Sequence, residues 1–482
     1  MPTADSVHRN FIAGDWVIGP DTYTNINPSD TNEVVGHYTH ADAAQAQAAV
    51  NAAHAALTSW QYSPIQQRFD ALDFIGTELL ARAKELGGLL SREEGKTLPE
   101  GIGEVARAGY LFKFFAGEAL RQGGELLAST RPGLTVEITR EPVGAVALIA
   151  PWNFPMAIPA WKIAPALCYG NTVIFKPAEL VPGCAWALTE IISRSGLPKG
   201  VFNLLMGRGS VLGDVLVNAP EIRAISFTGS VATGSSIATK AVARRAKIQL
   251  EMGGKNPLVV LDDADLATAV GVAVNGAYFS TGQRCTASSR LIVTDGIYGR
   301  FLQALTERLA GLRVGHALES ATHIGPVVDE RQMHTDLQYI EIGKNEGATL
   351  HFGGKRIKRD TPGFFLEPTL FTDTTPAMRI NQEEIFGPVA TVIRVKDYEQ
   401  ALQVANDVPF GLSAGIMTTS LKHAADFRRR SQAGMVMVNV PTAGVDYHVP
   451  FGGAKGSSYG PREQGRYAAE FYSTVKTAYV AP

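Results

Sequence analysis

The chain has 482 residues, 45% hydrophobic and 19% charged, with a formal net charge of −2. This balance is typical of a soluble globular protein with large cores, and the length predicts two or three domains. The small net charge gives no electrostatic reason to expect nucleic acid or an anionic membrane as a partner. The three cysteines, Cys168, Cys184 and Cys285, are too sparse for a secreted disulfide framework, and none has metal-ligand spacing.

The N-terminal residues contain no basic stretch followed by an apolar run, so we expect no signal peptide. The longest apolar run, 145–161, contains three prolines and Asn153, which argues against a membrane-spanning helix. A cytoplasmic protein without a bound metal is therefore expected.

The first third of the chain has helical patterning. Residues 42–60 are rich in alanine, and Asp42 is a suitable N-cap. Residues 64–90 carry apolar side chains at helical spacing, and residues 99–120 look helical as well.

Short apolar strands then alternate with helices. The predicted strands are 143–150, 172–175, 201–205 and 224–227, separated by helices at 159–168, 184–195 and 211–217 and followed by one at 231–241. A second alternation begins with a strand at 258–261, a helix at 266–279, a strand at 290–293 and a helix at 299–312, and continues to about residue 440. Such alternation predicts parallel sheets whose ligands bind beyond the carboxyl ends of the strands.

Three short motifs carry groups suited to carbonyl chemistry. Cys285 lies in the polar sequence Ser-Thr-Gly-Gln-Arg-Cys-Thr-Ala, whereas Cys168 and Cys184 lie in apolar helical segments and are expected to be buried and inert. Glu251 follows a strand-like run and precedes two glycines, which leave it room to move. Asn153 lies between the prolines of Pro-Trp-Asn-Phe-Pro, so its amide is held in a stiff turn. Thiol, carboxylate and amide can add a nucleophile to a carbonyl, hold an oxyanion and deliver water.

These motifs resemble the signatures of the NAD(P)-dependent aldehyde dehydrogenase superfamily, and the resemblance extends from Phe11 to Thr477. It implies that Cys285 is the nucleophile, with an activated thiol, and that Glu251 is the general base for thioester hydrolysis. Asn153 would share the oxyanion hole with the backbone N–H of Cys285. Glu463, in Gly-Pro-Arg-Glu-Gln-Gly, matches a glutamate that could relay protons, and a surface role is the alternative.

The resemblance also implies the cofactor site. Lys176 and Glu179 follow a strand and would bind the ribose hydroxyls of NAD, although NADP stays open. Gly229 and Ser230 open a helix, where backbone N–H groups suit a pyrophosphate, although the full Gly-x-Gly-x-x-Gly fingerprint is absent. The remaining expected cofactor contacts are Trp152, Glu384 and Phe386.

The implied fold is an α/β aldehyde dehydrogenase-like architecture with a Rossmann-type cofactor domain, a second α/β catalytic domain and a small β bridging flap. The expected cofactor domain comprises 1–120 and 143–250, and the catalytic domain 251–453. The bridging segments are 121–142 and 466–482, in which the alternating patterns of 134–140 and 471–480 predict edge strands. A homodimer or homotetramer follows from the resemblance.

The chain looks most similar to the α-ketoglutaric semialdehyde (2,5-dioxopentanoate) dehydrogenase branch, so a small semialdehyde acid is the expected substrate. Arg284, beside the nucleophile, would anchor its distal carboxylate, and pairing with a protein group is the alternative. Trp161 is expected to line the substrate site, at a position where succinate-semialdehyde dehydrogenases typically carry arginine. Succinate semialdehyde, broad aldehyde specificity, a CoA-acylating enzyme and a non-catalytic cofactor-binding protein stay as alternatives, and Glu251 argues against the CoA reaction.

Overall fold

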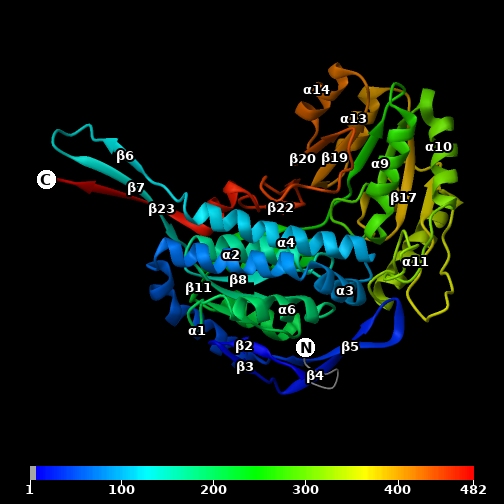
Figure 1. Cartoon of the computed structure of the whole chain (residues 1–482). Helices are drawn as coiled ribbons and strands as arrows, with labels where there is room; N and C mark the ends of the chain where they lie inside the picture. Colours follow the sequence, from blue (N-terminus) through cyan, green and yellow to red (C-terminus); the bar gives the residue numbers. More distant parts are fainter. Residues whose placement is uncertain (1–6) are drawn as a thin grey trace.

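The structure, a computed structural model that describes residues 7–482, contains two α/β bodies and a projecting β ribbon (Figure 1). Each body is built on one large sheet, with helices packed against it. Within residues 7–482 no helix is both long enough and apolar enough to cross a bilayer.

The first body contains an eight-stranded sheet with the order β22-β12-β11-β8-β9-β10-β2-β3. Its five central strands are parallel, as the alternation of strands and helices predicted. The edge strands β22, β2 and β3 pair antiparallel. The bounds are β2 (Asn10–Ile12), β3 (Asp15–Val17), β8 (Ala145–Ile149), β9 (Thr172–Lys176), β10 (Phe202–Leu204), β11 (Ile222–Thr228), β12 (Lys247–Glu251) and β22 (Ser458–Tyr459).

Both faces of this sheet are buried, which explains why its strands are continuously apolar rather than alternating. In β8, Val146 and Leu148 enter one hydrophobic cluster, whereas Ala145 and Ala147 enter another on the opposite face. The helices of this body are α1 (Ala43–Gln61), α2 (Ile65–Ala81), α3 (Ala83–Glu94), α4 (Leu98–Ala119), α5 (Ala157–Cys168), α6 (Pro182–Ser193), α7 (Gly209–Asn218) and α8 (Val231–Ala243).

The predicted N-terminal helices are present, with one break. Asp42 caps α1 by accepting a hydrogen bond from the N–H of Gln45 at 2.8 Å. The helical pattern over 64–90 forms two helices, because Arg82 leaves helical geometry (φ −101°, ψ 14°) between α2 and α3. Its guanidinium is held there by Glu85 and by Glu190 of α6, at 2.8 and 3.0 Å.

The second body has a seven-stranded sheet with the order β15-β16-β17-β14-β13-β19-β20, parallel except for β15 at one edge. Its strands are β13 (Pro257–Val260), β14 (Arg290–Thr294), β15 (Thr349–Phe352), β16 (Thr369–Thr372), β17 (Val389–Val395), β19 (Ser413–Met417) and β20 (Met435–Val438). Its helices are α9 (Leu266–Tyr278), α10 (Asp295–Ala310), α11 (Glu330–Asn345), α12 (Arg379–Gln382), α13 (Tyr398–Asn406) and α14 (Leu421–Arg430). The strands β18 (Phe410–Gly411) and β21 (Ala454–Lys455) form a separate pair.

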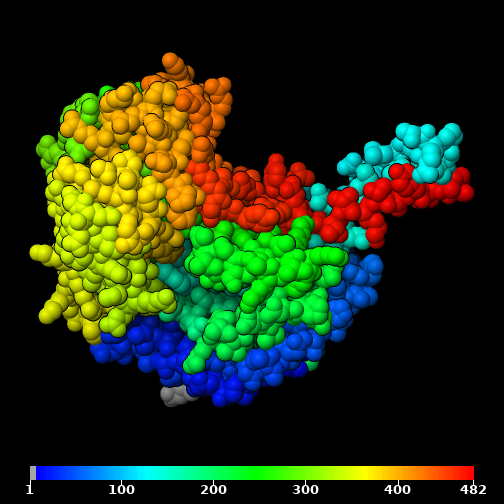
Figure 2. Space-filling model, turned by 180° about the vertical axis from the view of Figure 1, so that it is seen from behind, coloured from blue at the N-terminus to red at the C-terminus, as the bar shows by residue number. Residues whose placement is uncertain are grey.

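A three-stranded ribbon projects from the first body (Figure 2). It consists of β6 (Glu125–Ala128), β7 (Thr135–Pro142) and β23 (Ser473–Val480), and the last two pair antiparallel over eight residue pairs. The two predicted edge strands, 134–140 and 471–480, are therefore confirmed as strands and are partners. Leu126, Val475 and Tyr479 are 72%, 61% and 59% exposed on this ribbon.

Sequence reasoning made no prediction for a second three-stranded sheet, β1 (Val7–His8), β4 (Asp21–Asn27) and β5 (Asp30–His40), in the order β1-β5-β4. Its strands are rich in polar residues, so they lack the apolar pattern that marks the strands of the two large sheets. The remaining short elements are η1 (Phe279–Gly282), η2 (Arg466–Ala468) and α15 (Ala469–Tyr472).

Candidate active site

Cys285 lies in the turn that follows α9 and η1, beside two cavities. One cavity, of about 390 Å³, is here called the substrate-side cavity; the other, of about 200 Å³, is called the cofactor-side cavity, and Cys285 lines both. The turn is strained, because Ser280 and Thr281 have positive φ values of 52° and 58°. Glu100 accepts hydrogen bonds from the N–H and hydroxyl of Ser280, both at 2.9 Å, and so holds the turn from α4.

The surroundings of Cys285 favour its neutral thiol over the thiolate. Burial, with the nearby carboxyl groups of Glu384 and Glu251, raises the pKa of Cys285 to about 12, although the backbone N–H groups of Cys285 and Thr286 lower it. This direction is opposite to the activation expected from the sequence, because the charged side chains that act most strongly on the thiol are carboxyls. An activated thiol therefore stays a prediction. A general base or a positive charge near the sulfur would favour the thiolate.

Asn153 lies beside the nucleophile segment and is 3% exposed. Its Nδ2 donates a hydrogen bond to the carbonyl of Gln283 at 3.0 Å. An amide nitrogen carries two hydrogens, so one remains for another acceptor. Asn153 and Cys285 both line the cofactor-side cavity, which places an amide donor and the backbone N–H of Cys285 near the same space.

Glu251 ends β12 at the carboxyl edge of the first sheet, and its side chain is 3% exposed. Its Oε2 accepts a hydrogen bond from the hydroxyl of Ser458 at 2.5 Å. A Cβ added at Gly452 would lie 2.8 Å from its Oε1, so the glycine leaves the carboxyl the room it occupies. Burial, and then the charge of Glu463, raises the pKa of Glu251 well above its ordinary value, the direction that a general base requires.

Glu463 is buried, so the alternative of a surface role is wrong. It is 2% exposed and forms an ion pair with Lys162, which is fully buried on α5. The hydroxyl of Ser226 donates to the same carboxyl at 3.1 Å. The other oxygen, Oε2, has no hydrogen-bond partner in the described part of the chain. Lys162 and Glu463 therefore form a buried ion pair, and the charge of Glu463 also acts on Glu251.

The cofactor-side cavity contains most of the residues expected to bind the cofactor. The Trp152 and Phe386 rings meet edge to face at 5.4 Å, and Phe386 has a positive φ of 68°. Glu384 accepts a hydrogen bond from the N–H of Gly254 at 2.8 Å, and burial raises its pKa to about 7. A Cβ at Gly253 would lie 2.1 Å from the Glu384 carboxyl, so a larger residue there would force this carboxyl to move. The full lining is Pro151, Trp152, Asn153, Ile158, Thr228, Gly229, Ser230, Met252, Gly253, Cys285, Gln332, Glu384 and Phe386.

Lys176 and Glu179 lie together at the end of β9, outside the lining of that cavity. Lys176 is buried and donates to the carbonyl of Pro177 at 3.0 Å, whereas Glu179 is exposed and accepts from the N–H of Gly209 at 3.1 Å. Gly209 begins α7, and Ser230 caps α8 with its side chain toward Thr233. The ribose-binding candidates and the two helix N-termini thus share the carboxyl edge of the first sheet.

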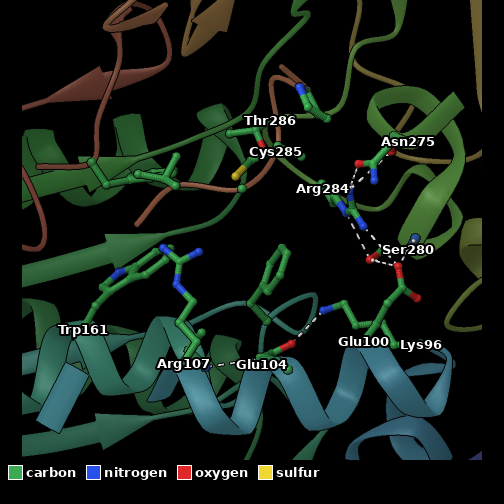
Figure 3. A pocket seen from close by; sticks show the side chains of 18 residues that line it. Lys96, Glu100, Glu104, Arg107, Trp161, Asn275, Ser280, Arg284, Cys285 and Thr286 are labelled. Atoms are coloured by element: carbon green, nitrogen blue, oxygen red, sulfur yellow. Dashed lines mark hydrogen bonds and ion pairs between the residues drawn. The ribbon is translucent and has the colours of Figure 1, made fainter. Parts of the chain in front are cut away.

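The substrate-side cavity lies between α4, α5 and the Cys285 turn (Figure 3). Arg284 lines it, but its guanidinium is paired with Glu100 at 3.0 Å and donates to Ser280 at 3.0 Å. Trp161 forms another wall and stacks on Phe451 at 5.0 Å. The cavity is lined by Lys96, Glu100, Gly103, Glu104, Arg107, Phe154, Ala157, Trp161, Asn275, Ser280, Arg284, Cys285, Thr286, Pro441, Ala443, Gly444, Val445 and Phe451.

Comparison with known proteins decides the family. Residues 16–478 match the aldehyde dehydrogenase family. The chain belongs to this family. The α-ketoglutaric semialdehyde dehydrogenase of Bacillus subtilis is 43% identical over 485 residues, covering 100% of this chain and 99% of that enzyme. The 2,5-dioxopentanoate dehydrogenase of Saccharolobus solfataricus is also 43% identical, covering 97% of this chain and 98% of that enzyme.

The aldehyde dehydrogenase fold is likewise shown. A solved structure of Staphylococcus aureus betaine aldehyde dehydrogenase in complex with NAD⁺ superposes with a TM-score of 0.96 at 36% identity, covering 98% of this chain and 95% of that one. The implied α/β fold with a second α/β body and a β flap is confirmed. The residue boundaries proposed for its domains stay a prediction.

Three residues of this aldehyde dehydrogenase site were not predicted. Gln332 of α11 lines the cofactor-side cavity, Lys162 pairs with Glu463, and Arg107 of α4 lines the substrate-side cavity. Gln332 and Arg107 lie in helices without a local motif, so only the packing of helices around Cys285 reveals them. Lys162 follows the Pro-Trp-Asn-Phe-Pro motif along the chain, but its pairing with distant Glu463 has no local signal.

Proposed function

We propose that this aldehyde dehydrogenase oxidises a small semialdehyde acid, such as α-ketoglutaric semialdehyde, to the corresponding dicarboxylate with NAD as the hydride acceptor. The observation that carries the proposal is the position of Cys285 where the two cavities meet. An aldehyde on one side and a nicotinamide on the other can both reach the sulfur. The overall reaction consumes aldehyde, NAD⁺ and water, and yields carboxylate, NADH and protons.

The cofactor-side cavity fits a dinucleotide. The hydroxyl of Thr228, in its lining, is buried and lacks a hydrogen-bond partner among residues 7–482. Glu384 would hold the nicotinamide ribose, with Trp152 and Phe386 against the ring, and Lys176 and Glu179 would hold the adenosine ribose. Gly229 and Ser230 would present the N-terminus of α8 to the pyrophosphate. Bound NAD supplies the acceptor for the hydride.

The protein's own groups perform the remaining chemistry. The Cys285 thiolate attacks the carbonyl carbon, and the Asn153 amide and the Cys285 N–H stabilise the resulting oxyanion. Collapse of the thiohemiacetal with loss of hydride leaves a thioester on the sulfur. Glu251 then removes a proton from water, hydroxide attacks the thioester, and the sulfur leaves as thiolate. Lys162 and Glu463 would pass the proton onward from Glu251.

NAD rather than NADP is favoured by Glu179. Its carboxylate is exposed and accepts one hydrogen bond from Gly209, so lone pairs remain for a ribose 2′-hydroxyl. The same charge would repel a 2′-phosphate. The structure of the Staphylococcus aureus relative, solved with NAD⁺, supports the same choice.

We also propose a homodimer or homotetramer in which the ribbon of β6, β7 and β23 joins subunits. Exposed apolar side chains on that ribbon favour a protein contact. The proposed cofactor domain, 1–120 and 143–250, would then carry the bridging segments 121–142 and 466–482, with 251–453 as the catalytic domain.

The substrate proposal draws on the names of the similar enzymes and on the basic side chains of the substrate-side cavity. Succinate semialdehyde, and a broad range of aldehydes, are the alternatives within this chemistry. An NADH-coupled panel of aliphatic, aromatic and ω-carboxy aldehydes, run with and without CoA, tests it. A preference for α-ketoglutaric semialdehyde without CoA is expected. NADH formation only with CoA would favour the acylating reaction, and no NADH with any aldehyde would favour a non-catalytic protein.

A further inference from the structure

The charged side chains of the substrate-side cavity do not balance. Lys96 is paired with Glu104 at 2.8 Å, and both side chains are 2% exposed. Arg284 is paired with Glu100 at 3.0 Å. These two pairs use both acidic residues that line the cavity, and Arg107 is the remaining cation of the lining. Its guanidinium has no carboxylate within ion-pair distance in residues 7–482.

Arg107 lies on α4, one turn after Glu104, and its side chain extends into the cavity below Cys285 (Figure 3). Its Nη2 donates a hydrogen bond to the side-chain oxygen of Gln464 at 3.1 Å. Its Nε is shielded from solvent and has no partner within the described range. The guanidinium carbon lies 5.8 Å from the centre of the Trp161 ring. A neutral amide and an aromatic face therefore orient the cation without neutralising it.

Glu104 and Asp446 lie near enough to favour the charged form of Arg107, but among residues 7–482 neither is within ion-pair distance of it. A shielded cation without a direct counter-ion is unfavourable unless something else supplies the charge. We propose that Arg107 binds the distal carboxylate of the substrate through its free guanidinium donors, while the aldehyde carbon lies at Cys285. A guanidinium can bind a carboxylate with two parallel hydrogen bonds, and such bonds are stronger than neutral ones. The inference rests on the proposed function and names the residue that selects acids in this cavity.

Arg284 is less suited to that role. All three of its guanidinium nitrogens have partners: Nε donates to Ser280, Nη1 contacts Asn275 at 3.4 Å, and Nη2 donates to Glu100. A carboxylate arriving there would meet the negative charge of Glu100. Arg284 instead ties the strained turn before Cys285 to α4, which makes it a positioning residue.

The test compares two arginine variants on two aldehydes of equal length. Arg107→Met keeps an unbranched side chain and removes the charge, and Arg284→Met is the matched control. The substrates are 5-oxopentanoate and pentanal, assayed at saturating NAD. For Arg107→Met we expect kcat/KM for 5-oxopentanoate to fall about 10- to 100-fold, the range of charged hydrogen bonds, while pentanal changes less than about threefold. Arg284→Met should lower kcat/KM for 5-oxopentanoate and for pentanal by the same factor.

Two further measurements separate binding from folding. Arg107→Lys should recover part of the loss, because it restores the charge without the planar fork. Glutarate should compete with aldehyde in the wild type, and its inhibition constant should rise about 10-fold or more in Arg107→Met. Thermal melting and NAD binding, both unchanged, would show that the variant is folded.

The outcomes distinguish this inference from the proposed function. A wild type that prefers 5-oxopentanoate, with Arg107→Met keeping that preference, overturns the role of Arg107 and leaves the acid substrate standing. Equal losses on both aldehydes in Arg107→Met also overturn it, because the residue would then be structural. A wild type that prefers pentanal overturns both the acid substrate and the anchor, whereas aldehyde oxidation itself stands.

Discussion

The two cavities that meet at Cys285 are lined by different types of residue. The cofactor-side cavity is lined mainly by uncharged residues, among them two glycines and the aromatic rings of Trp152 and Phe386, and Glu384 is the one charged side chain that residues 7–482 contribute to it. The substrate-side cavity is lined by five charged side chains, three of which come from α4. The cofactor-side cavity would bind groups that every dinucleotide shares, and most of its residues lie in short sequence motifs. The substrate-side cavity would recognise one substrate class, and its character depends on which charges are paired.

The largest effect is expected at the residue that belongs to both cavities. Cys285→Ala should lower turnover by about 1,000-fold or more, since the covalent route is lost. NAD binding and thermal stability should change little, because the side chain contributes neither a hydrogen bond to the fold nor a charge. Steady-state NADH formation measures turnover, and a fluorescence titration measures NAD binding. Cys184→Ala, a change at a buried cysteine of α6, is the control. Turnover in Cys285→Ala close to wild type would eliminate the mechanism.

Most residues expected to bind the cofactor line the cofactor-side cavity, and the expected Trp161 and Arg284 line the substrate-side cavity. Lys176 ends β9 and Gly229 directly follows β11, so their place at the sheet edge follows from topology. Glu384 follows the short helix α12, and only the family resemblance predicted its place.

The pairing of charges in the substrate-side cavity could not be predicted from sequence. Arg107 and Arg284 are both arginines near the nucleophile, and nothing local says which is paired. Glu100, which decides the matter, is 184 residues from Arg284 along the chain. Long-range pairing of this kind is absent from local patterns.

The secondary structure also contains elements that the sequence predicted and elements that it did not. The buried parallel strands such as β8 and β9 were predicted because two covered faces impose continuous apolar runs. The sheet of β1, β4 and β5 was missed, because its polar residues give no such run. The break at Arg82 depends on Glu190, which lies on α6 far along the chain.

The second largest effect is expected at Glu251, which serves the hydrolytic half of the reaction. Glu251→Gln should lower steady-state turnover by about 100-fold, the usual scale for a general base, while the first-turnover burst of NADH survives. Rapid mixing with excess aldehyde measures both. Glu118→Gln, a buried carboxyl on α4 far from the thiol in sequence, is the control for loss of a buried charge. Equal loss of burst and turnover would place Glu251 in the hydride step or in folding.

A smaller effect is expected on the pH dependence of hydrolysis. Glu251 acts as a base only when ionised, so hydrolysis should rise as pH increases through its raised pKa. Glu463→Gln removes a neighbouring negative charge, so the midpoint should move to lower pH. Ser458→Ala removes a hydrogen bond that stabilises the ionised form, so the midpoint should move to higher pH. Single-turnover hydrolysis of the acyl-enzyme against pH gives both midpoints, and shifts in the same direction would contradict this account.

The smallest effect is expected at the rim of the cofactor side, where solvent weakens electrostatics. Glu179 is exposed, so its repulsion of a 2′-phosphate is worth about 1 kcal/mol. Glu179→Gln should therefore raise kcat/KM with NADP about 5-fold relative to NAD, and added salt should reduce the difference. The 5-oxopentanoate-to-pentanal preference should stay unchanged in this variant, since the substrate-side cavity is untouched. Side-by-side kinetics with both cofactors measure the first quantity, and a wild type that clearly prefers NADP would refute the role of Glu179. A changed aldehyde preference would instead show that the two cavities are not independent.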